Sequence, residues 1–271
     1  MNICFIGGGN MASAMIGGLI KRGHSPASIR AVEINAECRE RLHEEFTIRA
    51  TSTDELAPAL AHSDVVILAI KPQQLREVAL KIAPLLSGQL LISIAAGIRA
   101  KDIARWTGTH NIVRVMPNTP ALIRSGISGL YAMPGVGERQ RDVAQQILMS
   151  VGSTLWLEDE TMMDAVTAIS GSGPAYFFYF IEALEQAGRE LGLSKEYSRQ
   201  LALETALGAA RLAHESTEEP AVLRARVTSK KGTTEKALMS MEANQVKQHI
   251  INAARAAAER SRELGEELGG D

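Results

Sequence analysis

Residues 3–20 read ICFIGGGNMASAMIGGLI, and this stretch decides the fold. A short apolar run at 3–6 predicts a buried strand, and the apolar spacing after the three glycines predicts a helix. Gly7, Gly9 and Ala12 have the G-x-G-x-x-A spacing of a dinucleotide-binding turn. The first glycine permits the tight turn, the second lets the backbone approach a pyrophosphate, and the small third residue lets helix and strand pack closely. The helix N-terminus then offers free N–H groups to the phosphates.

Composition excludes several other classes of protein. The chain has 271 residues, 45% of them hydrophobic, and a net charge of -2, which argues against a partner made of nucleic acid or a membrane surface. No apolar run is long enough to cross a bilayer. The two cysteines indicate no disulfide framework, and the histidines lack the spacing of metal ligands. Because the first strand begins at Ile3, we expect no signal peptide and a cytoplasmic protein.

Strands and helices alternate along the first 157 residues, which predicts a doubly wound, Rossmann-like α/β domain over 1–157. In particular, the continuous apolar run at 64–70 is typical of a central parallel strand. Thr53 is a candidate N-cap for a helix ending at Ala61. The expected strands are 3–6, 28–34, 47–51, 64–70, 90–94, 111–115, 126–132 and 153–157, and the expected helices between them include 36–46, 53–61, 74–85, 101–106 and 138–150.

The remainder, 158–271, predicts an all-helical second domain that binds substrate and forms a dimer. Pro174 opens a long helix and Gly192 ends it. The apolar helix faces are extensive for so short a segment, so we expect a second subunit to cover them in a homodimer. The expected helices are 162–169, 174–191, 195–215, 219–227, 233–242 and 244–267, and the tail 265–271 is expected to be disordered.

Ligands of a doubly wound sheet bind beyond the carboxyl ends of its strands, which defines the cofactor candidates. Glu33, about 20 residues beyond the glycine turn, is placed to meet a ribose 2′-hydroxyl of NADH and to repel the 2′-phosphate of NADPH, although Arg39 or Asn35 would accept that phosphate and a solvated Glu33 is equally compatible. Lys71 ends the strand 64–70 and is either a ligand or a surface lysine. The small residues 95–97 leave room for a nicotinamide ring.

A second polar cluster lies in the helical half, where residues 227–234 read VTSKKGTT. Ser229, Thr233 and Thr234 are able to cap the helix that begins near 233, or to donate hydrogen bonds to a small anion at its N-terminus. Capping explains one hydroxyl, whereas three hydroxyls beside a glycine favour a ligand.

Six motifs occur in order along the chain and identify a resemblance. They are IGGGNMA at 6–12, AIKPQ at 69–73, SIAAG at 93–97, RVMPNTPAL at 114–122, SGSGPAYFF at 170–178 and TSKKGTT at 228–234. Together they closely resemble pyrroline-5-carboxylate reductases, which catalyse the last step of proline biosynthesis. The resemblance covers almost the whole chain, and the motifs at 114–122 and 170–178 are far more specific than the glycine turn.

The resemblance implies NAD(P)H-dependent reduction of 1-pyrroline-5-carboxylate to L-proline, at an active site on a dimer interface, in dimers that often assemble into decamers. It implies a substrate site at Ser229, Gly232, Thr233 and Thr234, with Thr234 as the catalytic hydroxyl. The cofactor site, NADPH or NADH, is assigned to Ile6, Gly7, Gly8, Gly9, Asn10, Met11, Ala12, Glu33, Ala69, Ile70, Lys71, Ala95, Ala96, Gly97 and Asn118.

The loop at 229–234 departs from the family's usual S-P-G-G-T-T, because Lys230 and Lys231 replace the proline and a glycine. Losing that glycine matters only if its φ is positive, a conformation that lysine resists. Two other readings of the whole chain remain open. A β-hydroxyacid dehydrogenase would need a catalytic lysine on a helix of the second domain, and a non-enzymatic nicotinamide sensor would lack a second ligand pocket.

Overall fold

The computed structural model describes residues 1–270, and its contacts divide the chain into two compact units. Unit 1 combines Met1–Ser172 with the residues from Ala257 onward, and unit 2 is Gly173–Ala256. The boundary at 157/158 that the sequence predicted therefore differs from this division by 15 residues, and the last helix returns to unit 1. Residue 271 of the predicted tail lies outside the described residues.

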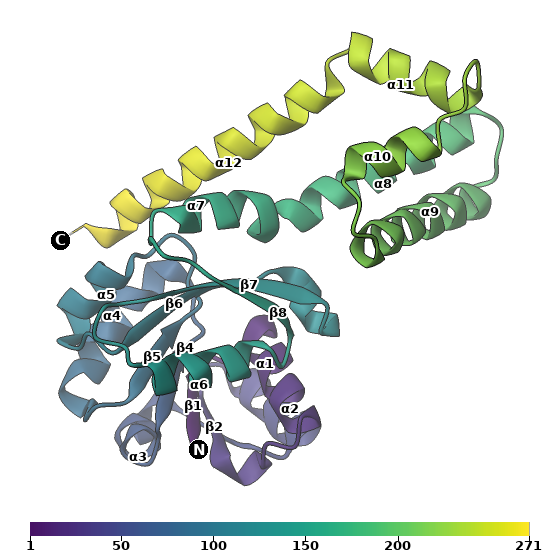
Figure 1. Cartoon of the computed structure of the whole chain (residues 1–271). Coiled ribbons are helices and arrows are strands. Elements are labelled where there is room, and N and C mark those ends of the chain that lie inside the picture. The colour runs from purple at the N-terminus through teal and green to yellow at the C-terminus, as the bar shows by residue number, and fades with distance from the viewer. Residues whose placement is uncertain (271) are drawn as a thin grey trace. The chain divides into compact units, whose positions relative to one another are not determined.

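Unit 1 contains one eight-stranded sheet in the order β3-β2-β1-β4-β5-β6-β7-β8 (Figure 1). The six strands from β3 to β6 are parallel, β7 is antiparallel to β6, and β8 is parallel to β7. The predicted doubly wound sheet is confirmed, with two reversed strands at one edge. The strands are β1 Ile3–Ile6, β2 Ile29–Val32, β3 Arg49–Thr51, β4 Val65–Leu68, β5 Leu90–Ser93, β6 Ile112–Met116, β7 Gly126–Ala132 and β8 Gly152–Trp156.

Helices cover both faces of this sheet and enclose a core on each side. One core joins α1, α2 and α6 to the strands, and the other joins α3, α4 and α5. These helices are α1 Asn10–Lys21, α2 Ala36–Phe46, α3 Leu56–Ala61, α4 Pro72–Ile82, α5 Ala100–Thr107 and α6 Glu138–Leu148. The predicted N-cap at Thr53 is wrong: residues Thr53–Glu55 form a 3₁₀ turn that begins after Ser52, and α3 starts at Leu56.

The C-terminal segment is ordered as far as it is described, which corrects the predicted disorder of 265–271. Helix α12 continues to Gly269, and Arg105 Nη2 donates to the Gly269 carbonyl at 2.5 Å. A Cβ on Gly265 would lie 2.8 Å from the Gly97 carbonyl oxygen, and one on Gly269 would collide with the Asp102 carboxylate. The glycines that resemble a flexible tail in the sequence instead let α12 approach α5 closely.

Unit 1 also contains the segment that leads into unit 2. Helix α7, Met162–Val166, runs into a π-turn at Thr167–Gly171. The Ser172 N–H donates to the Thr167 carbonyl at 2.8 Å, and a Cβ on Gly171 would lie 2.5 Å from Met116 Cε. The π-turn therefore packs against the last residue of β6.

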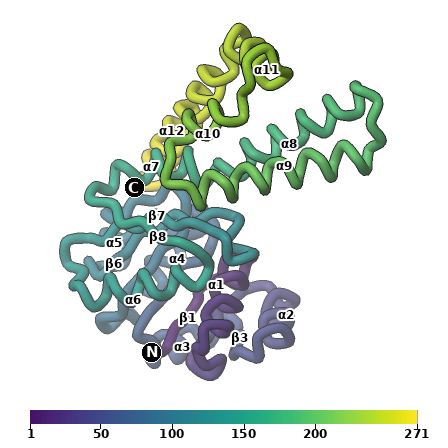
Figure 2. The backbone as a smooth tube through the Cα atoms, turned by 45° about the vertical axis from the view of Figure 1, so that its right-hand side comes forward, coloured from purple at the N-terminus to yellow at the C-terminus, as the bar shows by residue number. Residues whose placement is uncertain are grey.

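Unit 2 is all-helical, as predicted, and the antiparallel helices α8 and α9 lie side by side (Figure 2). Its elements are α8 Gly173–Glu190, α9 Lys195–Glu215, α10 Pro220–Arg226, α11 Thr233–Ala243 and the first part of α12 Val246–Gly269. The predicted stop at Gly192 is confirmed by its left-handed φ of 94°. Among residues 173–256, Ala202 is the only buried apolar side chain.

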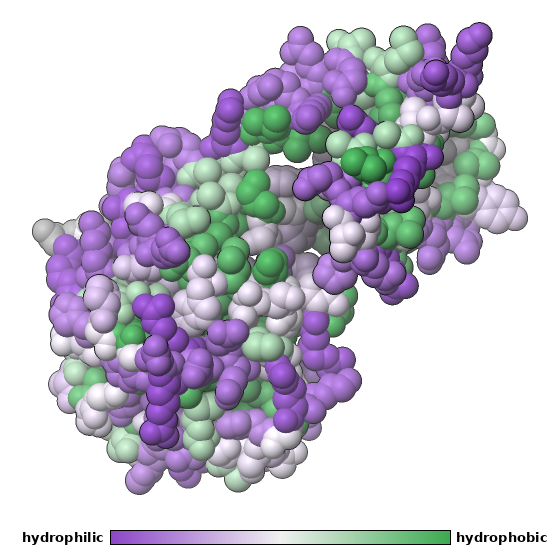
Figure 3. All heavy atoms as spheres, in the orientation of Figure 1, coloured by the Kyte–Doolittle hydropathy of each residue, from purple (hydrophilic) through white to green (hydrophobic). Residues whose placement is uncertain are grey.

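Most large apolar side chains of unit 2 are exposed in the single chain. Phe177, Phe178 and Tyr179 on α8 are 69%, 66% and 77% exposed. Figure 3 shows hydrophobic residues on the visible surface of these helices. Faces this apolar need a partner. Within residues 1–270, no helix is both long and apolar enough to span a bilayer.

Candidate functional site

The strand order places the candidate site at the point where the chain reverses direction across the sheet. From β1 the chain builds β2 and β3 on one side, and it then returns to add β4 on the other side of β1. Ligands of open α/β sheets bind in the crevice at this switch point, beyond the carboxyl ends of the strands. The turn after β1 and the segment after β4 meet here, because the Ala69 N–H donates to the Ile6 carbonyl at 2.8 Å.

The three glycines after β1 lie in three different environments. Gly7 has a φ of 98°, and a Cβ there would collide with the Ala69 carbonyl and lie 2.8 Å from Ile70 Cγ2. A Cβ on Gly8 would lie 2.7 Å from Leu42 Cδ1 of α2. Gly9 has an ordinary φ of -67°, and a Cβ there would meet no atom within 4 Å. The backbone needs glycine at the first position and packing needs it at the second, whereas nothing inside the protein needs it at the third.

Gly9 is also the N-cap of α1, which has no side-chain cap. The first N–H groups of a helix have no acceptor within the helix, so those of α1 face outward beside Gly9 with the positive end of the helix dipole. The open side of Gly9 admits an anion to these groups. The residues therefore fit the phosphates of a dinucleotide, as the sequence predicted.

The segments after β4 and β5 continue the same edge of the sheet. Ala69 and Ile70 are half-buried, and Lys71 is exposed as the N-cap of α4. Beyond β5, Ala95 is buried and Gly97 has a φ of 81°. Parallel strands end at a common edge, so the structure brings these predicted residues together with 6–12.

Asn118, after β6, is 9% exposed, and its Oδ1 accepts a hydrogen bond from the Ile127 N–H at 2.9 Å. The side-chain oxygen of Asn118 therefore anchors the start of β7. This hydrogen bond gives the buried Asn118 a structural role. A contact between Asn118 and the cofactor stays a prediction.

Glu33, just after β2, is tied to the glycine turn by both carboxylate oxygens. Oε2 accepts the Gly8 N–H at 2.6 Å, and Oε1 accepts the Asn35 N–H at 2.8 Å. Asn35 itself caps α2 through Oδ1, which accepts the Cys38 N–H. Arg39 Nη1 donates to the Glu33 carbonyl at 2.8 Å. The predicted binding region for the ribose 2′ group is therefore built around a fixed carboxylate. Arg39 and Asn35, the two residues suggested to bind a 2′-phosphate, already form hydrogen bonds within this loop and α2.

Sequence reasoning missed Cys38 and Arg41, which contact the glycine turn from α2. Cys38 Sγ donates to the Gly8 carbonyl at 2.8 Å, and Arg41 Nη2 donates to the same oxygen at 3.3 Å. The signal that could have found them is their spacing of three on α2, which puts both on the side facing α1.

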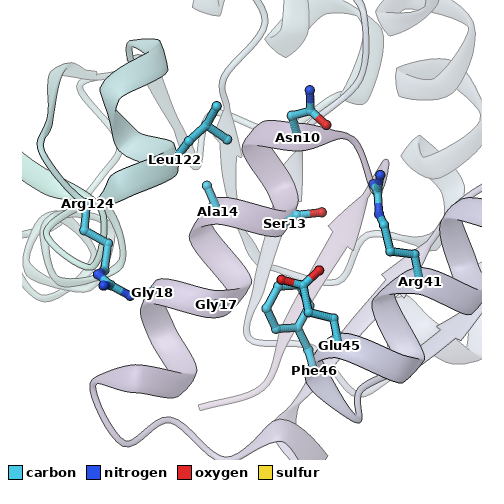
Figure 4. Close-up of a pocket in the computed structure, with 10 residues that line it drawn as sticks. All are labelled: Asn10, Ser13, Ala14, Gly17, Gly18, Arg41, Glu45, Phe46, Leu122 and Arg124. Carbon is cyan, nitrogen blue, oxygen red and sulfur yellow. The ribbon is translucent and has the colours of Figure 1, made fainter. Parts of the chain in front are cut away.

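Arg41 also lines a pocket of about 390 Å³ that runs along the outer face of α1 (Figure 4). Asn10 and Ser13 lie at its α1 wall, and Leu122 and Arg124 come from the 3₁₀ turn Thr119–Ile123 and its end. This pocket shares only Asn10 with the predicted cofactor residues, so it borders the switch-point crevice rather than forming it.

The predicted substrate loop lies in unit 2, between α10 and α11. Gly232 is the N-cap of α11, and no side chain caps this helix, so the predicted caps Ser229, Thr233 and Thr234 are not used as caps. A Cβ on Gly232 would collide with Ser229 Oγ, and the Gly232 N–H donates to the Ser229 carbonyl at 3.1 Å. The three hydroxyls thus remain at an uncapped helix N-terminus.

Lys231 has a φ of 59°, in the left-handed region, at a position where the S-P-G-G-T-T motif has glycine. Its N–H donates to Glu235 Oε2 at 2.7 Å, and this bond holds the strained turn on α11. The lysine therefore adopts a conformation that favours glycine, at a cost in backbone strain. Lys230 and Lys231 are exposed and add positive charge beside the helix N-terminus.

Two protein families match this chain. Residues 160–264 match the family described as pyrroline-5-carboxylate reductase dimerisation. Residues 2–97 match the family described as NADP oxidoreductase, coenzyme F420-dependent. The first match spans the helices of unit 2 and the segments on either side, and the second spans β1 to β5 with their connections.

Full-length relatives carry one name. The chain is 50% identical over 269 residues to a pyrroline-5-carboxylate reductase of Pseudomonas aeruginosa, covering 98% of each chain. A pyrroline-5-carboxylate reductase structure from Coxiella burnetii has a TM-score of 0.91 at 39% identity, covering 97% of this chain and 98% of the other. The Plasmodium falciparum pyrroline carboxylate reductase with NADP bound has a TM-score of 0.87 at 32% identity, covering 98% of each chain.

Proposed function

Because the chain belongs to the pyrroline-5-carboxylate reductase family, we propose that it reduces 1-pyrroline-5-carboxylate to L-proline with NAD(P)H. The observation that supports the proposal is Gly9, where a side chain would meet no protein atom within 4 Å and the space is open to an incoming ligand. The proposal extends to the residues that perform the reaction and to the oligomer in which they act.

The cofactor binds along the carboxyl edge of the sheet. The N-terminus of α1 at Gly9 would hold its pyrophosphate, with the N–H groups of Asn10 and Met11 as donors. Segments 69–71 and 95–97 would line the nicotinamide end, where the small residues 95–97 leave space for the ring. When bound, the dinucleotide supplies the hydride.

Glu33 sets the preference between the two cofactors. The N–H groups of Gly8 and Asn35 hold its carboxylate at the end of β2. A 2′-phosphate placed there meets like charge, whereas a 2′-hydroxyl finds an acceptor. We expect Glu33→Ala to raise the ratio of kcat/KM for NADPH to that for NADH by roughly tenfold.

The substrate binds at the N-terminus of α11. The uncapped helix end, with Ser229, Thr233 and two lysines, attracts the substrate carboxylate, and Thr234 hydrogen-bonds the ring nitrogen. No acid or base is needed on the chain if the imine arrives protonated, so catalysis rests on holding imine and nicotinamide together. Such positioning is worth roughly 7–11 kcal/mol.

A homodimer completes the enzyme. The aromatic side chains of α8 are exposed, and unit 2 has almost no buried apolar side chains of its own. A second copy of the chain is needed to cover these apolar faces. Assembly into decamers and a cytoplasmic location remain expectations, which sedimentation and cell fractionation would test.

The test of the function is steady-state oxidation of NADH and of NADPH, each with and without racemic pyrroline-5-carboxylate, with proline measured as the product. Thr234→Ala should lower kcat while NADP⁺ binding stays nearly intact. Thr228→Ala is the matched control, because the Thr228 hydroxyl is already bonded to the Arg224 carbonyl. Turnover of hydroxyacids in place of the imine would refute the proposal in favour of a dehydrogenase, and equal loss of both properties in Thr234→Ala would refute its assigned role.

A further inference from the structure

Tyr176 contains a buried polar atom that has no hydrogen-bond partner within the single chain. Among residues 1–270, its phenolic oxygen is the only buried side-chain nitrogen or oxygen without a hydrogen-bond partner. A buried hydroxyl without a partner costs about 1–3 kcal/mol. Phenylalanine would fill the same space without that cost, so the hydroxyl calls for an explanation.

Tyr176 differs in exposure from the four aromatic residues that follow it on α8, which we assign to the subunit interface. Phe177, Phe178, Tyr179 and Phe180 are 43–77% exposed, whereas Tyr176 is not exposed. The apolar face of α8 therefore explains the later four aromatic residues and leaves the Tyr176 hydroxyl unexplained.

The position of Tyr176 in the chain links it to the candidate site. It belongs to the SGSGPAY motif at 170–176, which the proposed cofactor and substrate residues do not use. The motif begins inside the π-turn, where Gly171 packs against Met116 at the carboxyl end of β6. Single π-turns within helices occur frequently at functional sites. Helix α8 thus starts directly after a segment that contacts the ligand-binding edge of the sheet.

We propose that Tyr176 is a catalytic residue whose hydroxyl hydrogen-bonds a polar acceptor of the bound reactants. The acceptor is a carboxylate oxygen of the imino acid or the carboxamide oxygen of the nicotinamide. A phenol donates one hydrogen bond and accepts others, so either reactant satisfies it on binding. The inference rests on the reductase activity proposed above.

The test compares Tyr176→Phe with Tyr131→Phe, which removes the same hydroxyl from β7, outside the proposed site and outside the apolar helix faces of unit 2. Without ligands, Tyr176→Phe should unfold at the same temperature as the unsubstituted protein or at a higher one. Its kcat/KM should fall roughly 10- to 100-fold, as expected for a lost hydrogen bond to a polar or charged ligand atom. Tyr131→Phe should change neither property.

Two further measurements distinguish the acceptors. A higher KM for the imine, with a smaller thermal shift on adding proline, assigns the hydroxyl to the substrate. A higher KM for NADPH, with a smaller thermal shift on adding NADP⁺, assigns it to the cofactor.

The proposal is overturned if Tyr176→Phe matches Tyr131→Phe in kinetics and in both thermal shifts, as a buried water would predict. It is also overturned if Tyr176→Phe is less stable without ligands, because the hydroxyl then has a partner inside the protein. Failure of the reductase activity is a separate result: the unsubstituted protein would bind NADP⁺ and yet oxidise no cofactor in the presence of imine.

Discussion

Replacing Gly9 by alanine should weaken cofactor binding without weakening the fold. The new Cβ would meet no protein atom within 4 Å, and the φ of -67° suits alanine. Two small effects on stability oppose each other. Alanine stabilises by restricting the unfolded chain, about 0.4–1 kcal/mol, and it is a poorer N-cap than glycine by a similar amount. The free energy of unfolding should therefore change by less than about 0.5 kcal/mol.

The effect on binding is larger, because the Cβ occupies the side from which a phosphate approaches the N–H groups of α1. Losing a charge-assisted hydrogen bond costs about 1.5–3 kcal/mol, which corresponds to a rise of roughly 10- to 150-fold in the Kd of NADP⁺. Nucleotide titration by calorimetry measures the Kd, and urea unfolding measures the stability.

Gly137→Ala is the matched control. Gly137 is also an N-cap, of α6, with a φ of -73° and no atom within 4 Å of a Cβ. It should show the same small change in stability and an unchanged Kd. If Gly9→Ala bound NADP⁺ as tightly as Gly137→Ala does, the phosphates would not lie over Gly9 and the placement of the cofactor would be refuted.

Three further substitutions test other parts of the structure. Lys231→Gly relieves the left-handed φ of 59° and should raise the free energy of unfolding by about 1 kcal/mol in urea, whereas Lys230→Gly should not, since Lys230 has no positive φ. Burial raises the pKa of the Asp102 carboxyl, so the folded state loses stability as the pH rises from about 3 to 7 and the carboxyl ionises. The stability of Asp102→Asn relative to the unsubstituted protein should therefore increase over that pH range. A difference in melting temperature between the two proteins that stays constant over the range would contradict this. Glu160 Oε1 accepts hydrogen bonds from Arg114 at 2.8 Å and from the first N–H of α5, and Arg114 is only 4% exposed. Glu160→Gln should therefore lower the free energy of unfolding, measured in urea, by about 2 kcal/mol or more. An unchanged urea midpoint would mean that Arg114 needs no carboxylate.

Local patterns in the sequence determined most of the elements and the location of the cofactor edge. Continuous apolar runs predict buried parallel strands, and the residues that follow those strands must share one edge of a sheet. Gly7 and Ala12 were assigned from spacing alone, and the positive φ of Gly7 confirms the tight turn. These predictions succeed because each depends on residues that are neighbours in the chain.

Contacts between distant residues were decided by the tertiary structure. The tail looks disordered because Gly265 and Gly269 are poor helix formers, yet packing against Gly97 and Asp102 holds it as a helix. The hydrogen bond between Glu33 and Gly8 joins residues that are 25 positions apart, and no local pattern in the sequence predicts it. The sequence by itself determined the strand–turn–helix unit and the polar loop at 229–234, because local backbone preferences and hydrophobic periodicity encode them. Only the tertiary structure decided which glycine is free for a ligand and which hydroxyl is buried without a partner, because both depend on atoms that folding brings near.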